Sequence, residues 1–90
     1  MAARVHIIVR GLVQGVGFRY FVARCAARFN LSGFVKNLYN GDVEITAEGD
    51  RGSVEMLIKE VKVGPRSAHV SDCLVEWTDP EHSFKGFDIR

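Results

Sequence analysis

The dipeptide Asn40-Gly41 lies between two strand-like runs, residues 33 to 38 and 42 to 48. Asparagine and glycine both tolerate a positive φ angle, and together they are the strongest short-range signal for a β-hairpin. The pair therefore predicts two antiparallel strands in the middle of the chain. The other elements must be arranged around this hairpin.

A strand and a helix precede the predicted hairpin. Residues 5 to 10 place Val5, Ile7 and Val9 in alternation, which predicts a strand with one strongly apolar face. Residues 18 to 30 predict a helix, because their apolar side chains recur at spacings of three and four and form one stripe. The stripe comprises Phe18, Phe21, Val22, Cys25, Ala26 and Phe29.

A second helix and two more strands follow the hairpin. Apolar residues between 54 and 61 recur at helical spacing, and Gly64-Pro65 ends the predicted helix. The runs "HVSDCLVEW" and "FKGFDIR" predict a fourth strand and a short last strand. This order of elements is typical of the split βαβ, ferredoxin-like fold. We therefore expect an α+β sandwich, with an antiparallel sheet and two helices on one face.

Length and composition predict a single domain over residues 1–90, since 47% of the residues are hydrophobic and 26% are charged. The net charge of +1 provides no polybasic surface for nucleic acid or membrane. No apolar run approaches the roughly 20 residues of a membrane span, and signal-peptide features are missing, so we expect a cytoplasmic protein. Cys25 and Cys73 match no metal-binding spacing. They are expected to be reduced thiols, although a disulfide between them stays open.

The stretch "GLVQGVGFRY", residues 11 to 20, connects the first predicted strand to the first predicted helix. Gly11, Gly15 and Gly17 permit a tight turn, and the start of the helix adds free N–H groups and the positive end of its dipole. Such a concavity suits an anion, above all a phosphate. Arg19 could add a planar, bidentate guanidinium group. The alternative is a simple turn with a surface arginine.

This loop matches neither of the common nucleotide-binding motifs. It lacks the Lys-Ser/Thr pair that a Walker loop requires, and it contains no GxGxxG spacing. It offers a cradle for one phosphate and no ligands for Mg²⁺. The residues therefore predict binding of a single phosphoryl group, with no metal and no cofactor.

The run "GLVQGVGFRYFV" followed by "GFVKNLYNGDVEITAEG" resembles the two signatures of the acylphosphatase family, and the resemblance extends to the terminal "FDIR". It implies metal-free hydrolysis of a small acyl phosphate to a carboxylate and inorganic phosphate, with phosphate or sulfate as competing ligands. It also implies that Asn37 holds the attacking water. Separately, we expect the protein to be a monomer. The phosphoryl oxygens would be bound by the Arg19 side chain and by the main-chain N–H groups of Gly15, Val16, Gly17, Phe18 and Arg19.

The types of residue in the predicted site are consistent with this chemistry. Asn37 cannot take a proton at neutral pH, and His6, His69 and His82 lie outside both motifs. An acyl phosphate leaves as a carboxylate, whose conjugate acid has a pKa of about 4, so no general acid is needed. Phosphoryl transfer is mainly positioning and charge stabilisation, which an arginine, several N–H groups and an asparagine can supply.

Other roles stay open for several of these residues. Asn37 could cap the hairpin turn, although Asn40 is the better turn residue, and Gln14 could either touch the phosphate or brace the loop. The aromatic residues Phe18, Phe21, Phe34 and Trp77 are expected to pack in the core or at its edge. The carboxylates that follow the hairpin turn, Asp42, Glu44 and Glu48, are expected to be solvated charges.

Two other functions share this topology. RNA-recognition domains stack bases on exposed aromatic residues of their first and third strands, and the corresponding runs here contain none. Acylphosphatase-like domains also begin the large carbamoyl-transferring proteins that mature hydrogenases. No zinc-finger cysteines follow in this sequence, which favours a free-standing enzyme.

Overall fold

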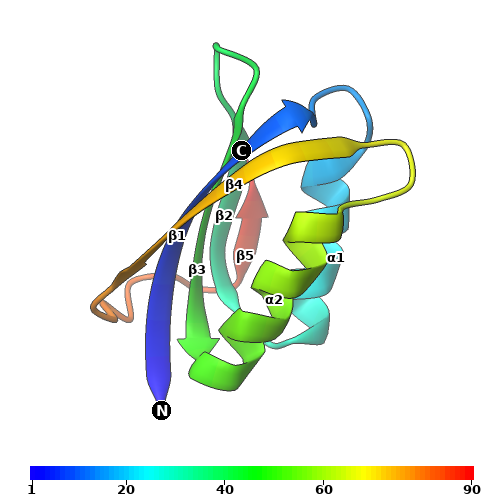
Figure 1. The fold of residues 1–90 in the computed structure, drawn as a ribbon. Coiled ribbons are helices and arrows are strands. Elements are labelled where there is room, and N and C mark those ends of the chain that lie inside the picture. Colours follow the sequence, from blue (N-terminus) through cyan, green and yellow to red (C-terminus); the bar gives the residue numbers. More distant parts are fainter.

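The computed structural model describes residues 1–90, which form five strands and two helices (Figure 1). In chain order these are β1 (Ala2–Leu12), α1 (Phe18–Arg28), β2 (Ser32–Asn37), β3 (Val43–Asp50), α2 (Arg51–Val63), β4 (His69–Thr78) and β5 (Phe87–Ile89). The expected ferredoxin-like order is confirmed. Neither helix is long and apolar enough to cross a membrane.

The strands form one sheet in the order β4-β1-β3-β2-β5. β1 pairs antiparallel with β3 and β4, and β2 pairs antiparallel with β3. The expectation of a wholly antiparallel sheet needs one correction, because β5 pairs parallel with β2. The chain leaves β4 at one edge, crosses the end of the sheet through residues 79 to 86, and enters β5 at the other edge in the direction of β2 (Figure 1).

Both helices cover the same face of the sheet (Figure 1), and the core lies between the two layers. Alternate residues of the three inner strands face the helices, as the apolar alternation in β1 predicts. The fully buried ones are Val5, Ile7, Val9, Val35, Val43, Ile45 and Ala47, and they pack against Phe18, Val22, Ala26, Val54, Leu57 and Val61. Cys25 is buried in this core, whereas Cys73 is half-buried on β4, and both are free thiols.

The ends of the helices follow from local backbone chemistry. α1 ends at Arg28, slightly before the predicted end, because Asn30 adopts a left-handed φ of 57° that a helix cannot continue through. α2 begins after Asp50, whose side chain accepts a hydrogen bond from the Gly52 amide at 3.2 Å. It ends at Val63, and the capping residue Gly64, which has a φ of 73°, confirms the predicted stop.

The hairpin between β2 and β3 is confirmed, with a loop over residues 38 to 42. Gly41 supplies the positive φ, at 96°, whereas Asn40 does not adopt one. Asn40 instead stabilises the turn through its side chain, which accepts a hydrogen bond from the Asp42 amide at 3.0 Å and donates one to the Asp42 carboxylate at 3.1 Å. Asn40 is therefore the turn residue, and Asn37 is the last residue of β2.

The sheet face opposite the helices carries charged residues in ion pairs. His6 Nε2 lies 2.8 Å from Glu44 Oε2, so this strand histidine has a partner on β3. Arg10 lies 3.5 Å from Asp42. The expectation that Glu48 is solvated is wrong, because its side chain is only 4% exposed. Residues 79 to 86, which show no periodicity in the sequence, cover it.

Candidate active site

The loop between β1 and α1 turns through two glycines with left-handed backbone angles. Gly15 has a φ of 72° and Gly17 a φ of 75°. A Cβ atom added at either position would meet no other atom within 4 Å, so the backbone angle and not the available space favours glycine. The loop therefore presents bare main chain toward solvent just before the helix.

The N–H groups of this loop and of the first turn of α1 are available to a ligand. Within the protein, no main-chain N–H of residues 15 to 19 donates a backbone or side-chain hydrogen bond. Gly17 caps α1 without a side-chain bond, and the first turn contains no acidic residue. Several N–H donors and the positive end of the helix dipole consequently converge where an anion would be stabilised.

The Arg19 side chain projects from the first turn of α1 and contacts the end of the chain. One of its terminal nitrogens donates a hydrogen bond of 2.9 Å to the main-chain oxygen of Arg90, which follows β5. The other guanidinium donors have no partner in the protein, and no carboxylate side chain lies within ion-pairing distance of Arg19. The contact orients the group while leaving most of its donors free.

A cavity of about 150 Å³ joins these features to the end of β2. Its lining includes Gly15 and Gly17 of the loop, Arg19 and Tyr20 of α1, and Asn37 of β2. The volume suits a phosphoryl group and one water molecule. The structure therefore brings Arg19 and Asn37, which are 18 positions apart in the sequence, to one small cavity together with the glycine loop.

Asn37 contributes an unpaired acceptor. Its side-chain oxygen Oδ1 is buried, and no donor of the protein reaches it. A buried acceptor without a partner costs about 1–3 kcal/mol, so this atom favours a small donor that enters the cavity. A water molecule is the simplest donor of that size.

Gln14 holds the loop against the hairpin. Its side-chain nitrogen Nε2 donates to the main-chain oxygens of Leu38, at 2.7 Å, and Asp42, at 2.8 Å. A primary amide has two N–H bonds, so these contacts use both donors. Of the two roles considered for Gln14, the bracing contact is the one seen in the structure.

Val16 and Phe18 anchor the loop to the core. Phe18 is fully buried in the core, and Val16 is partly buried and packs against the core. The main-chain oxygen of Val16 accepts a hydrogen bond of 2.9 Å from the Ser67 hydroxyl. Sequence reasoning missed both Ser67 and Arg90, because a polar residue after a helix and a chain-end residue carry no motif that connects them to a distant loop.

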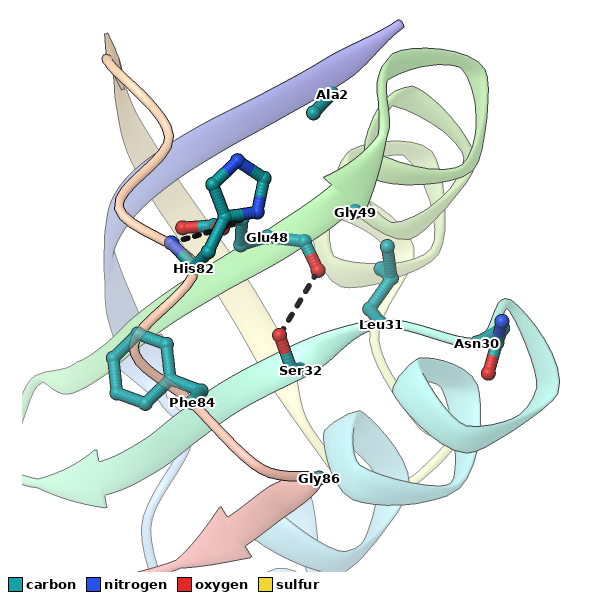
Figure 2. Close-up of a pocket in the computed structure, with 9 residues that line it drawn as sticks. All are labelled: Ala2, Asn30, Leu31, Ser32, Glu48, Gly49, His82, Phe84 and Gly86. Carbon is teal, nitrogen blue, oxygen red and sulfur yellow. Dashed lines mark hydrogen bonds and ion pairs between the residues drawn. The ribbon is translucent and has the colours of Figure 1, made fainter.

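Three larger cavities are also present. One, of about 500 Å³, is lined by Gln14 and residues 36 to 39, so it shares Asn37 with the candidate site. Another, of about 310 Å³, lies beside Glu48, His82 and Phe84 (Figure 2). The third, of about 330 Å³, is lined by Lys62 and residues 70 to 73. No predicted site residue lines the last two cavities.

Comparison with known proteins gives a consistent result along almost the whole chain. A family model described as acylphosphatase matches residues 5–89. The chain belongs to the acylphosphatase family. It is 48% identical to an acylphosphatase of Chlorobaculum tepidum over 86 residues, which cover 96% of this chain and 94% of that protein.

Solved structures agree with the family assignment. The fold matches a crystal structure of acylphosphatase from Bacillus subtilis with a TM-score of 0.94 and 40% identity, covering 100% of this chain and 99% of the other. It also matches 12% of the chain of full-length HypF, in a phosphate- and nucleotide-bound form, with a TM-score of 0.88 and 30% identity. Both signature-like stretches of the sequence lie inside the region matched to the family.

Proposed function

We propose that this protein is an acylphosphatase that hydrolyses the carboxyl-phosphate bond of small acyl phosphates without a metal ion. The observation that carries the proposal is the shared cavity, in which the glycine loop, Arg19 and Asn37 meet. Family membership over residues 5–89 supports the same hydrolase activity on acid anhydrides of phosphorus.

The phosphoryl group would bind between the loop and Arg19. The N–H groups of residues 15 to 19 and the free guanidinium donors then contact its oxygens, which carry the charge that spreads in the transition state. These donors are fixed before the substrate arrives, because Phe18 anchors the loop and Arg90 holds one arm of Arg19. Fixed donors require little reorganisation during the reaction.

Asn37 would aim the attacking water. Its unpaired Oδ1 accepts one hydrogen of the water, which turns a lone pair of the water oxygen toward phosphorus. The new O–P bond forms as the bond between phosphorus and the acyl oxygen breaks, and the electron pair of that bond leaves on the carboxylate. One water proton passes to a phosphoryl oxygen, so the products are a carboxylate and dihydrogen phosphate.

This scheme requires no general acid or base. The carboxylate leaving group has a conjugate acid with a pKa of about 4 and departs without a proton. An alkyl phosphate would leave as an alkoxide and would need a proton or a metal. The site should therefore select substrates by their leaving group, and the residue set of Arg19, Asn37 and main-chain amides supports that selection.

We further propose that the enzyme acts as a monomer in the cytoplasm, and that inorganic phosphate and sulfate compete with the substrate for the loop. Carbamoyl phosphate stays among the acyl phosphates to be tested, because acylphosphatase-like domains also begin large carbamoyl-transferring proteins. The chain covers 94% of the acylphosphatase of Chlorobaculum tepidum and 99% of the acylphosphatase chain from Bacillus subtilis.

Hydrolysis of benzoyl phosphate, carbamoyl phosphate and p-nitrophenyl phosphate, measured side by side in excess chelator, tests the proposal. We expect turnover of the acyl phosphates, no turnover of p-nitrophenyl phosphate, and competitive inhibition by inorganic phosphate. Complete loss of activity in chelator would contradict the metal-free mechanism. Non-competitive inhibition by phosphate would contradict its placement in the loop.

A further inference from the structure

Glu48 is a buried carboxylate beside His82 in the cavity of about 310 Å³ (Figure 2), and it is not among the residues that line the candidate active site. It lies near the end of β3, on the face away from the helices, and only 4% of its side chain is exposed. Burial of an ionised carboxylate is costly unless hydrogen bonds satisfy it. The contacts that stabilise Glu48 therefore indicate what this residue does.

Both carboxylate oxygens of Glu48 bind consecutive main-chain amides of the segment between β4 and β5. Oε1 accepts the N–H of Glu81 at 3.0 Å, and Oε2 accepts the N–H of His82 at 2.7 Å. Arg4 adds a hydrogen bond of 3.3 Å to Oε1. Hydrogen bonds to an ionised acceptor are stronger than neutral ones, so this is the firmest polar attachment of the segment.

The attached segment leads directly into β5. Residues 79 to 86 form neither helix nor strand. In addition to its bonds with Glu48, the segment is anchored by the side chain of Phe84, which packs edge-on against the Phe34 ring and lies under the Arg4 guanidinium group. The amide of Gly33 donates to the oxygen of Gly86 at 3.0 Å where β5 begins. β5 has only three residues, which pair parallel with β2 at one edge of the sheet, and its Phe87 packs against the core.

β5 ends at the candidate active site. The Arg90 amide donates to the main-chain oxygen of Val35 at 2.8 Å, and the Arg90 oxygen accepts the hydrogen bond from Arg19 at 2.9 Å. A continuous set of contacts thus runs from Glu48 through residues 81 to 90 to the guanidinium group. If the segment moves, the acceptor that orients Arg19 moves with it.

We infer that Glu48 is a positioning residue for Arg19, acting through the segment that places the Arg90 main-chain oxygen. The inference rests on the proposed function in so far as Arg19 binds the phosphoryl group. It gives this buried carboxylate a role in phosphate affinity, although Glu48 lines no part of the active-site cavity.

The variant Glu48→Gln tests this role. Glutamine keeps the size, but its NH₂ group would face one of the two amide N–H groups, donor against donor. We expect phosphate affinity and kcat/KM to fall about three- to tenfold. Glu81→Gln is the matched control, because it removes a neighbouring exposed carboxylate, 3.7 Å from Arg4, and leaves the main-chain amide of residue 81 in place. The control should bind phosphate like the unchanged protein.

A double-mutant cycle distinguishes positioning from general weakening of the fold. In an Arg19→Ala background, Glu48→Gln should no longer change phosphate affinity, measured by NMR titration with inorganic phosphate. An equal loss of affinity in both backgrounds would overturn the inference. If Glu48→Gln does not fold, Glu48→Asp, whose shorter carboxylate cannot reach both amides, is judged by the same measurements.

The resonance of the Arg19 Nη1–H, the group that donates to the Arg90 oxygen, provides a readout that needs no enzymatic activity. In folded Glu48→Gln without phosphate, it should shift toward the position of a free arginine, and in Glu81→Gln it should stay unchanged. An unchanged resonance in Glu48→Gln would contradict the inference even if the protein hydrolyses acyl phosphates. A protein that shows the shift but hydrolyses no acyl phosphate would contradict only the proposed function.

Discussion

The side-chain amide of Gln14 donates a hydrogen bond of 2.7 Å to the main-chain oxygen of Leu38, and so ties the loop before α1 to the residue that follows Asn37. Its second N–H donates to Asp42 on the other side of the hairpin turn. One side chain therefore sets the distance between the group that would bind phosphate and the group that would aim water. Small errors in such a distance reduce rates strongly.

Replacing Gln14 by methionine removes both hydrogen bonds while nearly conserving size. We expect kcat to fall about tenfold or more, because Asn37 loses its fixed position, while phosphate affinity stays unchanged. Steady-state kinetics and a phosphate titration separate the two effects. Weaker phosphate binding with an unchanged kcat would instead show that Gln14 touches the phosphate.

Alanine at Gly15 or Gly17 should weaken phosphate binding. Both residues adopt a left-handed φ, which costs a residue with a Cβ atom about 1–2 kcal/mol, so the loop would relax away from its anion-binding shape. Gly41→Ala is the matched control, because Gly41 also has a positive φ and free space around it but lies outside the loop. Calorimetric titration with phosphate and thermal melting should show lower stability in all three variants and lower affinity only in the first two.

Lysine at position 19 keeps the charge but loses the planar pair of donors. We expect phosphate affinity and kcat/KM to fall together, the latter by about 10²-fold, since the guanidinium contacts the anion in both the ground and the transition state. Arg24→Lys, at an exposed position on the same helix, controls for changes in α1 itself. Unchanged phosphate affinity in Arg19→Lys would remove Arg19 from the binding site.

Glu48 should make the stability of the fold depend on pH in the acid range. Burial raises the pKa of Glu48, but the hydrogen bonds from the Glu81 and His82 amides and from Arg4, together with the charge of His82, lower the pKa more, so that it lies below the ordinary 4.5. A lowered folded-state pKa contributes stability that is present above 4.5 and is lost as the pH falls through the folded value.

Urea unfolding at several pH values measures this contribution. The unfolding free energies of the unchanged protein and of Glu48→Gln should differ most at pH 7, and the difference should shrink as the pH falls below 4.5. The difference in unfolding free energy between the unchanged protein and Glu81→Gln should not depend on pH to a comparable extent. A difference between the unchanged protein and Glu48→Gln that is constant from pH 7 to the acid range would contradict the ionised state of buried Glu48.

Much of the fold could be predicted from local sequence patterns, because most of its elements have a strong periodicity. The alternation in β1, the helical stripe from Phe18 onward and the turn signal at Asn40-Gly41 each reflect which face of an element is buried. Gly64-Pro65 marks the end of α2 for a similar local reason. These are short-range properties of the backbone and of apolar burial.

The remaining features depend on contacts between distant parts of the chain. The parallel pairing of β5 follows from how residues 79 to 86 cross the end of the sheet, and the burial of Glu48 follows from the same crossing. The contact between Arg19 and Arg90 spans 71 positions. No local pattern encodes these relationships. The glycines and Arg19 of the loop indicated an anion site with a simple turn as the alternative, and Asn37 was added by the resemblance to the acylphosphatase signatures.

The role of Asn37 separates an orienting mechanism from general-base catalysis. Asn37→Asp keeps the size of the side chain but places a carboxylate beside the bound anion. Because the amide donor is lost and the new charge repels the phosphoryl oxygens, we expect both kcat and phosphate affinity to fall. Activity at or above that of the unchanged protein would indicate that a base at this position removes a proton from water.

The most direct test of the account is kcat for an acyl phosphate in folded Asn37→Ala, with phosphate affinity measured on the same sample. Asn40→Ala serves as the control, since its side chain contacts only Asp42 in the same hairpin. We predict that Asn37→Ala lowers kcat about 10²- to 10³-fold while phosphate still binds with unchanged affinity. A kcat near that of the unchanged protein would contradict the account, because the water would then be held by another group.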